Sequence, residues 1–124
     1  MLIAQADNVI LQSMLYPIQT KGEKQMIVLN VTYHCKPDMK EEFLEAICTE
    51  GIDIACRAED GNIKYDYYFP AEGGDEMLLV EKWRDAEVLA RHATLPHFAR
   101  LGELKKEFVL QTEIERFEVP EAQG

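Results

Sequence analysis

Four strand-like segments, interrupted by two helical regions, constrain the fold of this chain more than any other feature of its sequence. In the first segment, MIVLNVTYH (26–34), apolar residues from Ile27 to Tyr33 alternate with a second set that contains Asn30. That alternation is typical of a strand with one wholly apolar face. Three further segments show strand patterns: NIKYDYYF (62–69), EMLLVEKW (76–83) and FVLQTEIERFEV (108–119).

The first helical region follows the first strand. Asp38, with Glu41 three residues later, predicts a capping box at its start, and Gly51 is expected to loosen the helix midway. The apolar stripe of this helix is expected to comprise Met39, Phe43, Ile47, Ile54 and Ala58.

The second helical region is divided. Asp85 predicts the cap of a short helix over residues 86–92, and Pro96 predicts the first turn of another helix that runs to about Glu107. The glycines between residues 70 and 75 predict a hairpin loop between the second and third strands. The order β-α-β-β-α-β therefore predicts an α+β fold of the ferredoxin-like type, an antiparallel sheet with the helices on one face.

The sheet face without helices needs another molecule to cover it. Large apolar side chains left in water would forfeit about 1.5–3 kcal/mol for each one that could be buried. We therefore expect a two-fold homodimer in which the two sheets pack together as a dimeric α+β barrel.

The length of 124 residues suits one domain, which we place at residues 26–119, between an N-terminal extension (1–25) and a C-terminal tail (120–124). A formal net charge of −10 disfavours nucleic acid as a partner. No apolar run approaches the ~20 residues of a membrane helix, so no membrane partner is expected. No basic segment precedes the apolar patch near the N-terminus, so we expect a cytoplasmic protein.

The cysteines and histidines give no metal-binding pattern. Cys35, Cys48 and Cys56 form an odd set without a C-x-x-C pair, which argues against a disulfide framework and a zinc knuckle. Cys48 and Cys56 fit as small apolar helix residues, and a reactive thiol at Cys35 stays open. His92 and His97 have a proline between them, which breaks the i, i+4 spacing of a helical zinc pair. We therefore predict no metal site.

Candidate site residues are those expected in the gap between sheet and helices. Asn30 could bind a substrate carbonyl or hydroxyl there, or else a neighbouring backbone group or water. Trp83 is either a core residue or a flat surface for an aromatic substrate. His92 and His97 could transfer a proton or be structural histidines, and Tyr65 could orient a phenolic ligand. The sequence contains no phosphate loop, nucleotide fingerprint or Ser-His-Asp pattern, so no cofactor is predicted.

The segments EDGNIKYDYYF and EKWRDAEVLARHATLPHF, with the spacings E-x-W and H-x4-H-F, resemble the antibiotic biosynthesis monooxygenase family, which includes quinol monooxygenases. The likeness covers residues 26–119. It implies a dimeric α+β barrel and, for many members, oxidation of an electron-rich phenol, quinol or polyketide aromatic by O2 without metal, flavin or haem. In that chemistry the deprotonated substrate itself reduces dioxygen, while the protein supplies a base, positioning and a dry pocket.

The resemblance also implies roles for individual residues toward a small aromatic substrate and O2. The catalytic set is His92, His97 and Asn30, and the substrate-binding set is Trp83, Tyr65 and Phe98. The haem-degrading branch of the superfamily needs a histidine on the last helix, and the sequence after Phe98 has none, which makes haem less expected. Two alternatives stay open, an enzyme that isomerises or processes a small metabolite and a non-catalytic dimer that binds an aromatic ligand.

Overall fold

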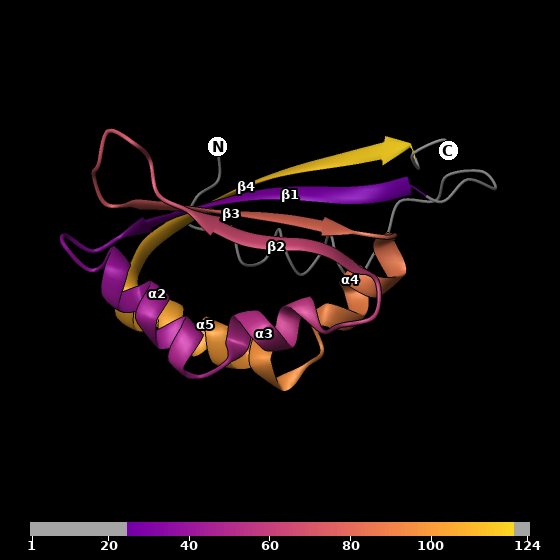
Figure 1. The fold of residues 1–124 in the computed structure, drawn as a ribbon, viewed down its shortest axis with the longest axis horizontal. Coiled ribbons are helices and arrows are strands. Elements are labelled where there is room, and N and C mark those ends of the chain that lie inside the picture. Colours follow the sequence, from indigo (N-terminus) through magenta and orange to yellow (C-terminus); the bar gives the residue numbers. More distant parts are fainter. Residues whose placement is uncertain (1–24, 121–124) are drawn as a thin grey trace.

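The computed structural model describes residues 25–120, whose fold is drawn in Figure 1. Apart from Gln25, the predicted extension lies outside the described residues, as does the tail beyond Pro120. None of the helices between residues 25 and 120 combines the length and the apolar character needed to cross a membrane. The elements in chain order are β1 (Gln25–Cys35), α2 (Lys40–Thr49), α3 (Ile52–Arg57), β2 (Asn62–Tyr68), β3 (Glu76–Trp83), α4 (Ala86–His92), α5 (Pro96–Phe108) and β4 (Val109–Pro120).

The four strands form one antiparallel sheet in the order β2-β3-β1-β4. β1 lies between β3 and β4, so the first and last strands of the described chain are neighbours. The helices lie together beneath one face of the sheet, and α2 packs against both α3 and α5 (Figure 1). The predicted ferredoxin-like α+β architecture is confirmed.

Alternation along the strands decides which side chains face the helices. In β1 every second residue from Ile27 to Cys35 is buried. Trp83 of β3 lies opposite Ile27, and Leu79 lies opposite Val31, so these fully buried side chains share the same face. The core is therefore the layer between this face and the helices.

The first predicted helix is in fact two helices. Gly51 has a φ of +71°, a left-handed conformation that ends α2, and α3 begins one residue later. Phe43 and Ile47 are fully buried, as the apolar stripe predicts. Beyond the break the register changes, so Ile54 is 67% exposed and Cys56 is buried in the core. The predicted continuation of the stripe to Ile54 and Ala58, both of which are exposed, is therefore wrong.

The predicted capping box at Asp38 is also wrong. Asp38 has a φ of +61°, and its backbone N–H donates to the Asp75 carboxylate at 2.9 Å. Met39 is the N-cap of α2 and makes no side-chain cap hydrogen bond. Asp38 therefore connects the start of α2 to the loop between β2 and β3 instead of capping the helix.

The helices after β3 follow the prediction. The Asp85 carboxylate accepts a hydrogen bond from the Val88 N–H at 3.0 Å and so caps α4. Pro96 is the first residue of α5, where its missing N–H costs nothing. Because α4 ends at His92 and α5 begins four residues later, His92 and His97 lie on either side of one short turn.

The sheet face that lacks helices carries apolar and charged side chains together. Val28 lies opposite Phe117, which is 47% exposed. Asn30 on the same face lies between Val80 of β3 and Glu115 of β4. This face is less uniformly apolar than we expected, and the homodimer through it stays a prediction.

The turn before β2 approaches α4 closely at Gly61. Its φ is +90°, and a Cβ at this position would lie 2.6 Å from the Val88 side chain. We expect Gly61→Ala to lower the free energy of unfolding by about 1–3 kcal/mol more than Gly73→Ala, because overpacking adds to backbone strain. Gly73 has a φ of +87° but a Cβ there meets nothing within 4 Å, so that variant isolates the strain. Equal losses of unfolding free energy in the two variants, measured by denaturant unfolding, would contradict the close contact at Gly61.

Candidate active site

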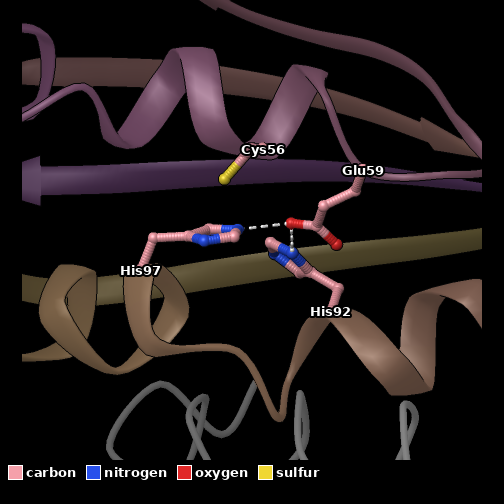
Figure 2. A group of neighbouring side chains, drawn as sticks. All are labelled: Cys56, Glu59, His92 and His97. Carbon is pink, nitrogen blue, oxygen red and sulfur yellow. Dashed lines mark hydrogen bonds and ion pairs between the residues drawn. The ribbon is translucent and has the colours of Figure 1, made fainter.

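Glu59 lies at the centre of a group of four neighbouring side chains (Figure 2). Its Oε2 atom is 2.6 Å from His92 Nδ1 and 2.6 Å from His97 Nε2. Cys56 points toward the same group from α3. Cys56 and His92 are buried, whereas the side chains of Glu59 and His97 are 8% and 19% exposed. The group is therefore most accessible to solvent at His97.

The turn between α4 and α5 brings the two imidazoles together. His92 is the last residue of α4, and His97 is the second residue of α5. The Leu95 N–H donates to the His92 carbonyl at 3.2 Å, which holds the turn. The helix break at Pro96 lets both rings reach Glu59, which precedes β2. The proline thus breaks the i, i+4 spacing, as the sequence predicts, and still leaves both rings in contact with one carboxylate.

Aromatic side chains surround His92. Its ring centroid lies 4.6 Å from that of Trp83, 5.1 Å from Phe98, 6.0 Å from Tyr65 and 6.0 Å from His97. Except for Asn30, all the predicted site residues thus belong to one contact group. Their roles in binding and proton transfer stay predictions.

Asn30 does not belong to this group. The alternation of β1 turns Leu29 and Val31 toward the helices and Asn30 toward the opposite face of the sheet. Its expected place in the gap between sheet and helices is wrong, because successive strand residues point to opposite faces. In the predicted dimer, Asn30 would lie between the two sheets.

Glu81 is the buried partner of Trp83. The fully buried indole donates its N–H to Glu81 Oε1 at 2.9 Å, and Glu81 is 5% exposed. Neither Glu81 nor Glu59 is among the site residues that the sequence predicted. The available signal was the E-x-W spacing, because residues two apart in a strand share a face.

The two carboxylates near the imidazoles have opposite pKa shifts. Burial raises the pKa of Glu81, against the charge of His92 and the hydrogen bond from Trp83. Burial also favours a raised pKa for Glu59, but hydrogen bonds from the two histidines outweigh it and lower the pKa. An ionised Glu59 accepts hydrogen bonds from His92 Nδ1–H and His97 Nε2–H, so the nitrogen left to act as a base in His97 is Nδ1.

Glu81→Gln is expected to stabilise the protein increasingly as the pH rises above 4.5, the ordinary glutamic acid value. A carboxyl group whose pKa is raised by folding contributes its full stabilisation of the folded state below its unfolded pKa. That stabilisation is lost as the pH rises through the pKa of the folded state. Glutamine keeps an oxygen for the indole N–H and has no charge to bury. Urea unfolding of both proteins from acid to neutral pH measures the difference, and a difference that stays constant with pH would contradict this account.

The thiols differ in their surroundings. Burial raises the pKa of Cys35 to about 11 and that of Cys56 to about 12. Both are therefore thiols near neutral pH, which argues against the reactive thiol considered at Cys35. Cys48 lies in α2, as predicted, but it is exposed, with Sγ 3.6 Å from Asp53 Oδ2.

Two surface hollows lie away from the Glu59 group. One, of about 460 Å³, lies along β2 and has Arg57, Lys64 and Lys82 in its lining. The other, of about 480 Å³, lies between α2 and the end of α5. Neither hollow is lined by Trp83 or by the two histidines. The ligand chamber expected beside the indole stays a prediction.

Comparison with known proteins gives one family and several similar structures. The model of the family described as antibiotic biosynthesis monooxygenase matches residues 26–103. The Bacillus subtilis (strain 168) protein named "Putative monooxygenase YcnE" is 33% identical over 73 residues, which cover 59% of this chain and 75% of that protein.

Solved structures share the fold. A conserved protein of unknown function from Bacteroides thetaiotaomicron VPI-5482, described as a "Possible Oxidoreductase", has a TM-score of 0.68 and 30% identity, over 77% of this chain and 98% of that one. The "Putative antibiotic biosynthesis monooxygenase from Nitrosomonas europaea" has a TM-score of 0.72 over 86% of this chain and 100% of that one. At 19% identity the second similarity concerns the fold alone.

Proposed function

The chain belongs to the antibiotic biosynthesis monooxygenase family, and from this premise we propose that it oxidises a small electron-rich aromatic of the quinol type with O2 and without a cofactor. One observation carries the proposal. Two imidazoles converge on one buried carboxylate directly beside a tryptophan, a tyrosine and a phenylalanine. This arrangement offers a base and an aromatic surface within one small region.

His97 is the proposed base. Glu59 holds its Nε2–H, which leaves Nδ1 to accept the phenolic proton of a quinol. His97 is the more accessible of the two histidines, and His92 packs between it and Trp83. Glu59 acts through the imidazoles as a positioning residue, because its carboxylate fixes their tautomers.

The substrate anion is the proposed reductant of dioxygen. It transfers electrons to O2, and a carbon–oxygen bond then forms at the ring. The product gains one oxygen atom and loses two hydrogens, and the second oxygen atom leaves with these hydrogens as water. The apolar walls supplied by Trp83, Tyr65 and Phe98 would keep the anion and its oxygenated intermediate away from bulk water.

Oxygen uptake by the full chain tests this function. The protein is treated with a chelator and assayed with a panel of hydroquinones and related phenols, with product mass as the second readout. Uptake above the rate of autoxidation, with one added oxygen atom per product, is the expected result. Uptake at the background rate for every compound would remove the monooxygenase assignment and leave the fold unaffected.

Two other outcomes correspond to the alternatives. Conversion of a substrate without oxygen uptake would favour an isomerase or another processing enzyme, and saturable ligand binding without turnover would favour a binding dimer. A haem-dependent reaction is less favoured. His97 does lie on the last helix, but it is the second residue there, and the sequence after Phe98 has no further histidine.

The homodimer is part of the proposal, because the open sheet face exposes Phe117 beside Val28. We expect wild type to be a dimer by size-exclusion chromatography with light scattering, and Phe117→Glu to be a monomer, since the substitution buries a charge in the interface. Ile54→Glu is the control, because Ile54 is 67% exposed on α3 in the helix layer. A wild-type protein that is monomeric in this measurement would contradict the predicted homodimer.

A further inference from the structure

We propose that Cys56, Glu59, His92 and His97 form a binding site for a divalent transition metal of the zinc class. Their ligand atoms all lie within 4.8 Å of one another. A tetrahedral zinc ion with bonds of about 2.0–2.3 Å holds its ligand atoms about 3.3–3.8 Å apart. Side-chain rotations that shift these atoms by about 1 Å would therefore complete a coordination shell.

The chemistry of the four groups selects the class of ion. Two imidazole nitrogens, a thiol and a carboxylate are ligands that zinc and cobalt accept, whereas calcium and magnesium require oxygen ligands. With four protein ligands the shell is closed, and no position remains for water. Such a site holds a structural ion and not a catalytic one.

The directions of the side chains fit this arrangement. Figure 2 shows the Cys56 sulfur directed from α3 toward the space where the Glu59 carboxylate meets the two rings. Cys56 is fully buried, so its sulfur is shielded from solvent. Binding of the ion would displace the thiol proton, as metals do on coordinating cysteine.

The charges around the group favour a cation. Glu59 and Glu81 place two carboxylates between the sheet and the helices, where Glu59 is held by two imidazoles and Glu81 by the indole N–H. A divalent cation bound at Glu59 would stabilise both carboxylates by charge. It would also connect the end of α3 to the turn between α4 and α5, so ion binding should stabilise the folded state.

Cobalt is the probe for the site. The full chain is reduced, freed of metal with a chelator and titrated with Co²⁺ without oxygen. We expect one equivalent to produce the intense visible bands of tetrahedral cobalt and a thiolate-to-cobalt charge-transfer band, and Zn²⁺ to abolish both. Zn²⁺ should also raise the melting temperature. A cobalt complex with only the weak bands of octahedral oxygen ligation would overturn the proposal.

Matched variants assign the ligands. Cys56→Ser is expected to remove the charge-transfer band and to weaken Zn²⁺ binding at least about tenfold, and Cys48→Ser to change neither. His34→Ala is the control for metal binding at the second group of possible ligands, which consists of His34, Glu76 and Glu113. Loss of the band in the Cys48 or His34 variant, or its persistence in Cys56→Ser, would overturn the assignment.

A second measurement covers the case in which Cys56→Ser does not fold. X-ray absorption of the zinc-loaded wild type is expected to show one sulfur at about 2.3 Å and three nitrogen or oxygen ligands at about 2.0 Å. His97→Gln, at a partly exposed position, should fold and lose one nitrogen ligand. A zinc environment without sulfur would exclude Cys56 and overturn the four-residue site.

One consequence rests on the proposed function. Zinc bound through Nε2 of His97 leaves the remaining ring proton on Nδ1, so the loaded protein lacks the proposed base. One equivalent of Zn²⁺ should therefore slow oxygen uptake, and a chelator should restore it. An unchanged rate of oxygen uptake in the zinc-loaded protein would overturn the inference that zinc binding blocks the proposed base. If the metal-free protein takes up no oxygen, the proposed function fails, and the cobalt spectra still decide the site.

Discussion

His97→Ala is expected to lower the rate of quinol-dependent oxygen uptake by a factor of about 10²–10⁴, the usual contribution of a general base. The variant removes the nitrogen that accepts the phenolic proton, and it leaves His92 and Glu59 paired. The free energy of unfolding should fall by about 1–3 kcal/mol, because the variant removes one hydrogen bond to the largely buried Glu59 carboxylate and His97 itself is only 19% exposed. Steady-state oxygen consumption in metal-free protein measures the effect. The loss should fall on kcat more than on KM.

His34→Ala is the matched control for this variant. His34 also interacts with carboxylates, those of Glu76 and Glu113, but it lies on the sheet face opposite the helices. Its replacement should leave the rate near that of wild type. If both variants keep the wild-type rate, His97 is not the base, and His92 becomes the remaining candidate among the histidines of the sequence.

Trp83→Ala is expected to lower the free energy of unfolding by about 3–5 kcal/mol, the usual loss for a buried large aromatic side chain. Trp83 is fully buried opposite Ile27 and packs on His92. The variant leaves a cavity in the core and also removes the N–H donor of Glu81. Denaturant unfolding followed by circular dichroism measures the loss, because the variant has no tryptophan for fluorescence.

Two further variants separate the terms of this loss. Trp83→Phe keeps a ring in the core but leaves the buried Glu81 oxygen without its donor, which should cost about 1–3 kcal/mol. Ile54→Ala removes a side chain that is 67% exposed and should change stability by less than about 0.5 kcal/mol. A Trp83→Ala protein as stable as wild type would show that the indole is not a core residue.

The error in the apolar stripe of the first predicted helix has one cause. The periodic pattern from Met39 to Ala58 fits one helix, yet Gly51 adopts a left-handed conformation that ends α2 and rotates the residues after it. Ile54 is therefore exposed, and Cys56 reaches the core. A sequence pattern detects a helix but not the point where a permissive residue turns the chain, because a glycine costs little in either conformation.

The site could be predicted in part. Aromatic residues and histidines with the family spacing do meet at His92, but Glu59 was not identified, and Asn30 was placed on the wrong side of the sheet. Glu59 belongs to a turn, where no periodic pattern indicates which way a side chain points. The strand pattern did put Asn30 on the face away from the buried residues, and the error lay in assigning it to the helix layer.

The sequence by itself determined the order of the elements, the inward face of β1, the Asp85 cap of α4 and the proline that begins α5, because these depend on residues that are near one another along the chain. Only the tertiary structure decided that Cys56, Glu59, His92 and His97 meet, and that Glu81 is buried under Trp83. Those contacts join residues up to 41 positions apart in the sequence, and they depend on how α3, α4 and α5 pack against the sheet. Packing geometry of that kind depends on the shapes of all the side chains in the core at once, and no local pattern encodes it.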